Sequence, residues 1–167
     1  MWLSKGKVPT LASAIVRPLV GGKLIETEAP HEVQRDIAAV LDQYLRDEQE
    51  ISTKAREIAE RRGSASEVGR IKRELAKQRG VGLGDDAIDY LLGQIVEMLM
   101  NSSNVDEIFA EDHQLKLAMR KPMRAEYALG EQMEETLRKR MKHVKEGSAD
   151  WEIEYQRMRD EVSRRRS

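Results

Sequence analysis

The sequence predicts an all-α fold of two tandem, related three-helix units packed as a pseudo-dimer, with short strand-like links inside the units. Three observations support this. Charged residues make up 35% of the 167 residues and aromatic residues only 4%. Apolar residues recur at alternating spacings of four and three. An ordered series of short helix, link, long helix and Gly-Ser break occurs twice. We expect repeat units at residues 1–80 and 81–167, together forming one compact domain.

The repeat appears when the chain is compared with itself at an offset of 80 residues. Segment 15–26, IVRPLVGGKLIE, then resembles segment 95–106, IVEMLMNSSNVD. The offset becomes 82 along the long helix, and both copies end that segment in Gly-Ser, at Gly63-Ser64 and Gly147-Ser148. Amphipathic helices resemble one another by chance, so the recurring order supports a tandem duplication better than the helical matches do.

The first unit begins with a helix over about 9–20, which Gly21-Gly22 should end. An extended piece at 23–26 leads to a long helix that starts near Pro30. Glu48 interrupts the long helix's apolar stripe, which consists of Ile37, Leu41, Tyr44, Ile51, Ala55 and Ile58. The stripe predicts one buried face.

A third helix follows Gly63 and should stop at Gly80. Ser64 and Glu67 have the spacing of a capping box, in which each side chain caps the other residue's backbone. Segment 80–87, GVGLGDDA, is the predicted linker between the units. Asp85 or Asp86 should cap the next helix.

The second unit opens with a helix over 87–100, the most apolar element of the chain and the expected shared core. Polar turn formers at 101–104, NSSN, replace the glycines of the first copy. Pro122 lies inside the expected long helix and should break or kink it. The stripe of the final helix is Trp151, Tyr155, Met158 and Val162.

Composition limits the classes of function. The net charge is −1 and there are no cysteines, which excludes disulfides, thiolate metal sites and a cysteine nucleophile. Lys5, Lys7, Pro9 and Arg17 interrupt the N-terminal apolar residues, so no export signal is expected. No apolar run approaches the roughly 20 residues of a membrane span. We expect a cytoplasmic protein without membrane insertion.

The sequence predicts no catalytic centre. The glycines at 21–22 and 80–84 lack the buried strand and the Gly-Lys-Ser/Thr signature of a phosphate loop, so helix termination explains them. His31 and His113 stand beside acids, but no HxxxH or HExxH pair lies on one helix face. The carboxylate clusters alternate with Lys and Arg as solvated helix faces do. We expect a non-enzyme with no cofactor and no metal.

A protein partner is the expected ligand. Apart from Met1, every methionine lies in the second copy. These side chains either fill gaps in an irregular core or form a deformable binding surface. The polar link is the other distinctive feature. The predicted partner-binding residues are therefore Asn101, Ser102, Ser103, Asn104, Asp106, Met119, Met123 and Tyr127.

Nucleic-acid binding is the alternative function. The basic segments 61–79 and 138–145 lie at corresponding places in the two copies and could contact phosphates. Cations that complement helix ends would give the same pattern, and stacking aromatics are sparse there. The residues of this alternative are Arg61, Arg62, Arg70, Lys72, Arg73, Arg138, Lys139, Arg140 and Lys142.

Four phrases give the chain a family resemblance: KGKVP, RDIAAVLDQYLRDEQEI, NSSNVDEIFAEDHQL and WEIEYQRM. With them the chain resembles, over nearly its whole length, a bacterial family known as domain-of-unknown-function family 507. The resemblance implies a soluble, mainly helical bacterial protein and brings no activity or catalytic residues. The element order is also similar to a histone fold, with two fused copies as a pseudo-dimer. The interrupting Pro122 and the lack of arginine-rich links depart from it.

Overall fold

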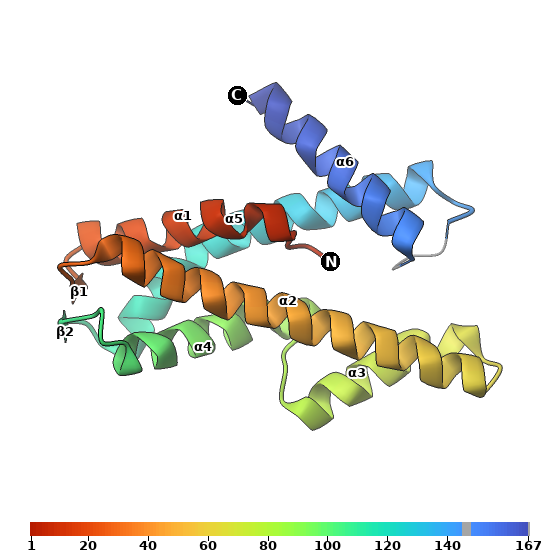
Figure 1. The fold of residues 1–167 in the computed structure, drawn as a ribbon, viewed down its shortest axis with the longest axis horizontal. Helices are drawn as coiled ribbons and strands as arrows, with labels where there is room; N and C mark the ends of the chain where they lie inside the picture. Colours follow the sequence, from red (N-terminus) through yellow and green to blue (C-terminus); the bar gives the residue numbers. More distant parts are fainter. Residues whose placement is uncertain (145–147, 167) are drawn as a thin grey trace. The chain divides into compact units, whose positions relative to one another are not determined.

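The computed structural model describes residues 1–144 and 148–166, and it is mostly α-helical as predicted. Short 3-10 turns precede three of the helices, at Lys5–Lys7, Ala65–Glu67 and Gly84–Asp86. The helices and strands are α1 Val8–Gly21, β1 Ile25–Glu26, α2 Pro30–Arg61, α3 Val68–Arg79, α4 Ala87–Asn101, β2 Glu107–Ile108, α5 Asp112–Arg140 and α6 Ala149–Arg166 (Figure 1).

Backbone contacts divide the chain into two compact units. The main unit is residues 5–123, and the hairpin unit is residues 1–4 with 124–167. This division describes spatial contacts. The expected division at residue 80 describes repeated sequence and stays a prediction.

Helix α2 is the centre of the main unit, where it contacts α1, α3 and α4. Helices α1 and α4 lie along its first half and α3 along its second half (Figure 1). The predicted stripe is the face that α2 buries, and its fully buried members include Ile37, Leu41 and Ile51. The buried residues of α4 recur three or four positions apart and therefore form one apolar face, as expected of a core helix.

The two predicted links pair with each other as the strands β1 and β2. The strands are antiparallel, with Ile25 opposite Ile108 and Glu26 opposite Glu107. Gly22 and Lys23 make the preceding turn, and Lys23 adopts a positive φ of 55°. The glycines of this link therefore end a helix, as the sequence predicted.

The second half of α2 packs on α3 through a small apolar cluster that contains Ala55, Ala59 and Ile71. Gly80 ends α3 in a left-handed conformation, as expected. Two predicted caps are absent. The Ser64 side chain makes no cap bond, and Glu67 instead pairs with Arg70 at 2.8 Å. Asp85 and Asp86 lie in a 3-10 turn without side-chain cap bonds, because that turn already bonds the backbone there.

The hairpin unit consists of the end of α5, α6 and residues 1–4. The apolar core of this unit contains Met133, Leu137, Trp151, Tyr155 and Met158. Trp151 is part of this core, and Trp2, the other tryptophan of the chain, is also buried and belongs to the same unit. Tryptophan fluorescence therefore reports on the unfolding of this unit.

Pro122 does not break the long helix, so of the two effects predicted, a break or a kink, the break is wrong and the kink stays a prediction. Helix α5 runs through it from Asp112 to Arg140. Proline costs a helix one backbone hydrogen bond and a steric clash. Met119 and Met123 on either side are fully buried. We attribute the helix's continuity to this packing, which offsets the local cost.

Candidate partner-binding groove

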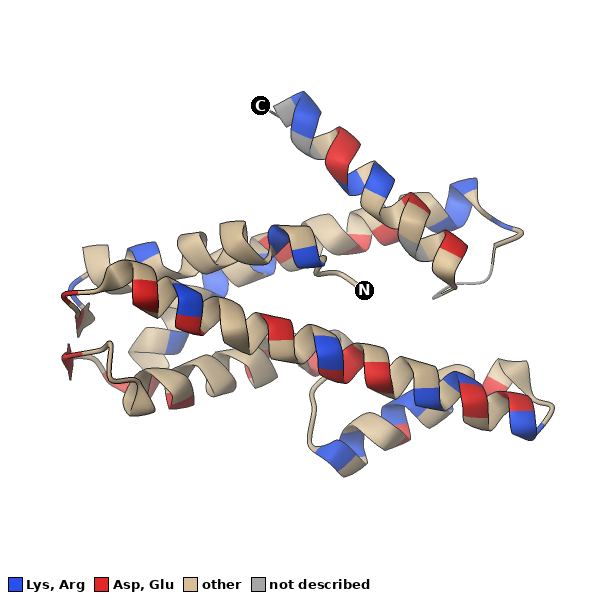
Figure 2. Cartoon of the chain, in the orientation of Figure 1, with Lys and Arg blue, Asp and Glu red and all other residues tan. Residues whose placement is uncertain are grey.

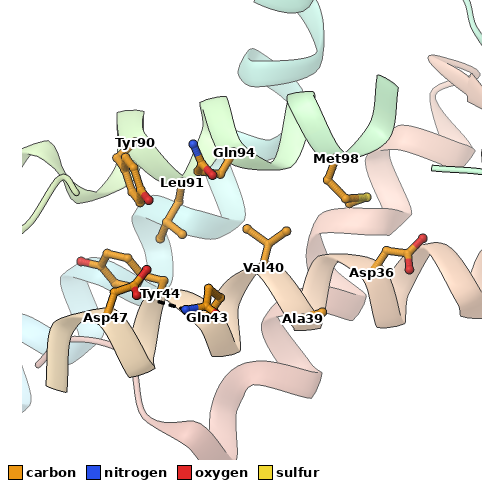
Figure 3. A pocket seen from close by; sticks show the side chains of 10 residues that line it. All are labelled: Asp36, Ala39, Val40, Gln43, Tyr44, Asp47, Tyr90, Leu91, Gln94 and Met98. Atoms are coloured by element: carbon orange, nitrogen blue, oxygen red, sulfur yellow. Dashed lines mark hydrogen bonds between the residues drawn. The ribbon is translucent and has the colours of Figure 1, made fainter. Parts of the chain in front are cut away.

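An open groove of about 320 Å³ runs between α2 and α4 in the main unit (Figure 3). The two helices are antiparallel, so Tyr44 of α2 faces Tyr90 of α4 at one end and Asp36 lies near Met98 at the other. The lining residues are Asp36, Ala39, Val40, Gln43, Tyr44, Asp47, Tyr90, Leu91, Gln94 and Met98. The groove combines an apolar floor with a polar rim.

The floor exists because both helices carry apolar residues beyond the face they bury. In α2 the run Ile37 to Leu41 is apolar without interruption, which is wider than a single stripe. Val40 stays half-exposed after Ile37 and Leu41 are buried. Met98 is likewise half-exposed on α4. These positions are the apolar surface that the fold leaves open.

Two tyrosines close one end of the groove. The rings of Tyr44 and Tyr90 lie 6.2 Å apart and are tilted by 40°. Gly82 packs so closely that a Cβ atom there would come within 2.6 Å of Tyr90 Cβ. Burial raises the pKa of Tyr90, and the neighbouring Asp47 carboxylate raises it further against the opposing effect of Arg79. The phenol is therefore a neutral donor at physiological pH.

Asp47 on the rim accepts two hydrogen bonds through Oδ1. Gln43 Nε2 donates one at 3.0 Å (Figure 3), and Arg79 of α3 donates the other at 3.1 Å. Arg79 also pairs with Glu50 at 3.1 Å. Arg79 therefore compensates part of the acidic charge at this end.

Asp36 at the other end of the groove holds the polar link at residues 101–106, between α4 and β2. Its Oδ2 accepts bonds from Ser102 Oγ at 2.7 Å and from Asn104 Nδ2 at 3.0 Å. Both donors are neutral, so they leave the carboxylate charge uncompensated. The link is polar because it fastens the end of α4 to α2.

This polar link also binds the segment around β1, residues 26–28. Thr27 Oγ1 donates to the Asn104 carbonyl at 2.5 Å, and the Glu28 amide donates to Asp106 Oδ2 at 3.0 Å. The Asp106 amide in turn donates to the Glu26 carbonyl at 2.8 Å. These bonds extend the strand pair on one side.

We expect Asp36→Ala to lower the free energy of unfolding by about 1–3 kcal/mol, because Ser102 and Asn104 lose their acceptor in a half-buried site. Thermal unfolding followed by circular dichroism measures the change. Glu32→Ala is the matched control, since Glu32 is exposed and bonds only Arg35 at 3.4 Å. An equal Tm for the two variants would contradict the role given to Asp36.

The predicted partner-binding residues take different places in the structure. Ser102, Asn104 and Asp106 bond within the fold as described. Asn101 and Ser103 are exposed. Met119 and Met123 are fully buried, which agrees with gap-filling in the core rather than with a binding surface. Half-buried Tyr127 packs against Trp2 in the hairpin unit, with ring centroids 5.4 Å apart.

The basic residues of the nucleic-acid alternative divide into two groups. One group pairs with acids: Arg70 with Glu67 and Glu74, Lys72 with Glu48, Arg138 with Glu134, and Lys139 with Glu135. In the described part of the chain, the others are exposed and make no ion pair. These are Arg61, Arg62, Arg73, Arg140 and Lys142. Lys145, at the end of the basic segment, lies outside the described residues.

Glu48 interrupts the apolar stripe of α2. It lies between the half of α2 that packs on α1 and α4 and the half that packs on α3. Lys72 Nζ of α3 lies 2.6 Å from Glu48 Oε1, and Ser52 Oγ donates to the same oxygen at 2.9 Å. Burial alone raises the pKa of Glu48, but the charge and hydrogen bond of Lys72 and the bond from Ser52 outweigh it, so the pKa is lowered. The charged form is stabilised.

A lowered pKa in the folded state gives a defined pH dependence. The stabilisation from Glu48 is fully present above its unfolded-state pKa of about 4.3, and it is lost as the pH falls through the lower folded-state value. We expect Lys72→Met to remove the charge and the hydrogen bond that most lower the pKa of Glu48. The folded-state pKa then rises, and the stability that Glu48 contributes above its unfolded-state pKa becomes smaller.

Urea unfolding of both proteins between about pH 3 and pH 6 measures this. The Glu48→Gln variant is the control, because it removes the titrating group. If wild type and Lys72→Met showed parallel curves, the ion pair would not set the pKa of Glu48.

Sequence reasoning missed the groove itself. Its signal was the extra apolar width of both helices, the run at 37–41 in α2 and the nearly all-round apolar character of α4. Within the described ranges, no three His, Asp or Glu side chains gather in a way that could hold a metal ion. None of the described helices has the length and apolar character that a bilayer crossing requires.

Comparison with known families agrees with the resemblance seen in the sequence. The family described as "Protein of unknown function (DUF507)" matches residues 1–167. The chain belongs to this family. The match covers all of α1 to α6, so both sides of the groove and both links are part of the DUF507 sequence. No curated protein matches the chain.

Proposed function

We propose that this DUF507 chain is a non-catalytic interaction protein, an adaptor or assembly factor that binds a protein partner. The observation that supports this most is the open groove between α2 and α4, whose apolar floor no other described segment lines. Binding sites in proteins are typically concave, with apolar floors and a few polar groups at the rim. The groove has that composition.

The charge pairing favours a protein partner over nucleic acid. Lys72, from the α3 group expected to contact phosphates, is a half-buried partner of Glu48. Arg70 pairs with Glu67, three residues before it, and with Glu74, four residues after it. Binding of phosphates through Lys72 or Arg70 would require these pairs to open, which leaves Arg61, Arg62, Arg73, Arg140 and Lys142 as the cations of the described residues that remain available for the alternative.

A pull-down tests this function, with the purified chain as bait in cytosol of the source organism. Extracts are compared with and without nuclease treatment. We expect a protein that is still retained after nuclease treatment. The substitution Met98→Glu in the groove should release this protein. Leu117→Glu is the matched control, since Leu117 is 71% exposed on α5 outside the groove. Circular dichroism confirms that both variants are folded.

Three results would contradict the proposal. Loss of all retained protein after nuclease treatment would favour nucleic-acid binding. Retention that Met98→Glu does not change would place the partner elsewhere. Release by Leu117→Glu alone would place the binding site on the exposed part of α5 instead.

We also propose that the chain arose by tandem duplication into a pseudo-dimer. The element order supports this: α1, β1, α2 and α3 correspond to α4, β2, α5 and α6. Helices α1 and α4 have 14 and 15 residues, and α2 and α5 have 32 and 29. An alignment built separately for each half from many family sequences tests the proposal. If the halves match no better than unrelated amphipathic helices, the duplication is refuted.

A further inference from the structure

We infer that the α2–α4 groove accepts one amphipathic helix of the partner, with an apolar face flanked by lysine or arginine. This inference rests on the proposed function and specifies the chemistry of the partner. The length of the groove, the spacing of its lining residues and the sign of its charge support it.

The length and spacing fit a helix. The α2 side of the groove extends from Asp36 to Asp47, which is about 17 Å at the rise of an α-helix. That distance corresponds to about three helical turns. The lining residues recur at helical spacings on both walls, at 36, 40, 43 and 47 and at 90, 94 and 98. Ridges of that spacing receive the side chains of a third helix.

A strand is a poorer occupant. Both walls are α-helices whose backbone groups are bonded within the helix, so no strand edge is available for pairing. The side chains therefore provide the whole recognition surface. The half-exposed Val40 and Met98 and the exposed Ala39 are the apolar contacts available to an incoming helix.

The charge of the groove selects a basic flank. Within the described part of the chain, the charged residues that line the groove are Asp36 and Asp47, and none of the lining residues is Lys or Arg. Helix α4 carries Asp89 and Glu97 and no Lys or Arg, as Figure 2 shows. Among the residues that the structure describes, the hydrogen-bond donors to Asp36 are the neutral side chains of Ser102 and Asn104. A cation beside Asp36 therefore gains attraction without displacing an existing ion pair.

Synthetic peptides of about 18 residues test the inference. The probe is a Leu/Lys peptide with leucines at helical spacing. One comparison peptide has glutamate in place of lysine, and another has the Leu/Lys composition in scrambled order. Isothermal titration measures binding to the full chain. We expect a Kd of about 1–100 μM for the Leu/Lys helix and binding at least about tenfold weaker for both comparison peptides.

Substitution of an exposed rim residue makes the test specific. Gln94→Lys places a cation in the groove, and we expect it to weaken the Leu/Lys helix about tenfold and to favour the Leu/Glu helix. Gln78→Lys on α3 is the matched control, because Gln78 is exposed and outside the groove. The control should leave the affinity unchanged.

The inference is overturned if the scrambled peptide binds as well as the helical one, or if Gln94→Lys and Gln78→Lys have equal effects. A preference for the Leu/Glu helix in the wild type would also overturn it. These failures are distinguishable from failure of the proposed function. A native protein released by Met98→Glu, with no preference for the Leu/Lys peptide, would leave the function standing and refute only the basic helix.

Discussion

Replacing Arg159 by methionine is expected to lower the free energy of unfolding of the hairpin unit by about 3–5 kcal/mol. Arg159 of α6 is 1% exposed. Its guanidinium pairs with Glu126 of α5 and donates to the Trp2 carbonyl at 3.0 Å. The guanidinium also reaches the Tyr155 hydroxyl at 3.4 Å. Methionine fills a similar volume but leaves the Glu126 carboxylate without its cation in a site that is 13% exposed.

Chemical unfolding followed by tryptophan fluorescence measures this loss, because Trp2 and Trp151 both belong to the hairpin unit. Adding Glu126→Gln to Arg159→Met is the control, since it removes the uncompensated charge. We expect the double variant to recover part of the stability. If the single and double variants were equally unstable, the pair would not be the source of the effect.

Gly130→Ala is expected to destabilise the same unit by about 3 kcal/mol or more, despite alanine's higher helix propensity. A Cβ atom at Gly130 would clash with the Trp2 carbonyl oxygen and would lie 2.6 Å from Trp2 Cα. Both atoms are backbone, so no side-chain rotation relieves the clash. Residues 1–4 must move, and the buried Trp2 ring then loses its packing.

Gly93→Ala is the matched control. Gly93 also lies inside a helix, α4, but a Cβ atom there meets nothing within 4 Å. Alanine should therefore stabilise the chain by about 0.5–1 kcal/mol through helix propensity. Thermal unfolding of the two variants compares the signs. A stabilising effect at both glycines would show that residues 1–4 do not pack against α5 as described.

Local patterns in the sequence predicted most of the helices. The stripe of α2, the ends of α1 and α3 at Gly21-Gly22 and Gly80, and the apolar character of α4 all appear in the structure as expected. The spacing of apolar residues and the glycines that end helices are local properties, so a sequence alone can show them. The family membership was likewise visible in the sequence, and the match over residues 1–167 confirms it.

The long-range partners were not predictable from local patterns. Arg159 stands among charged residues in the sequence and would ordinarily be solvent-exposed. Only the fold brings Glu126 and the Trp2 carbonyl to it. The polar composition of the link is visible in the sequence. The residue that accepts its hydrogen bonds, Asp36, is not, because it lies 66 residues from Ser102. The local cost of Pro122 is visible in the sequence, but the burial of Met119 and Met123 beside it depends on the fold.

The groove was predictable from the sequence only in part. Val40 and Met98 are ordinary apolar residues on helices that were correctly predicted. What the sequence could not show is which apolar positions remain uncovered once α1, α3 and α4 have packed on α2. Exposure of this kind depends on tertiary packing, although the extra apolar width of α2 was visible.

Site-specific cross-linking tests the central claim, that the α2–α4 groove binds a protein, most directly. The chain has no cysteine, so Gln94→Cys and Gln78→Cys each create a single attachment point for a thiol-linked photo-cross-linker. Both variants are irradiated in nuclease-treated cytosol and analysed by mass spectrometry. We expect a discrete protein that is cross-linked through position 94 and is absent from the products at position 78. Equal products at both positions, or none at position 94, would contradict it.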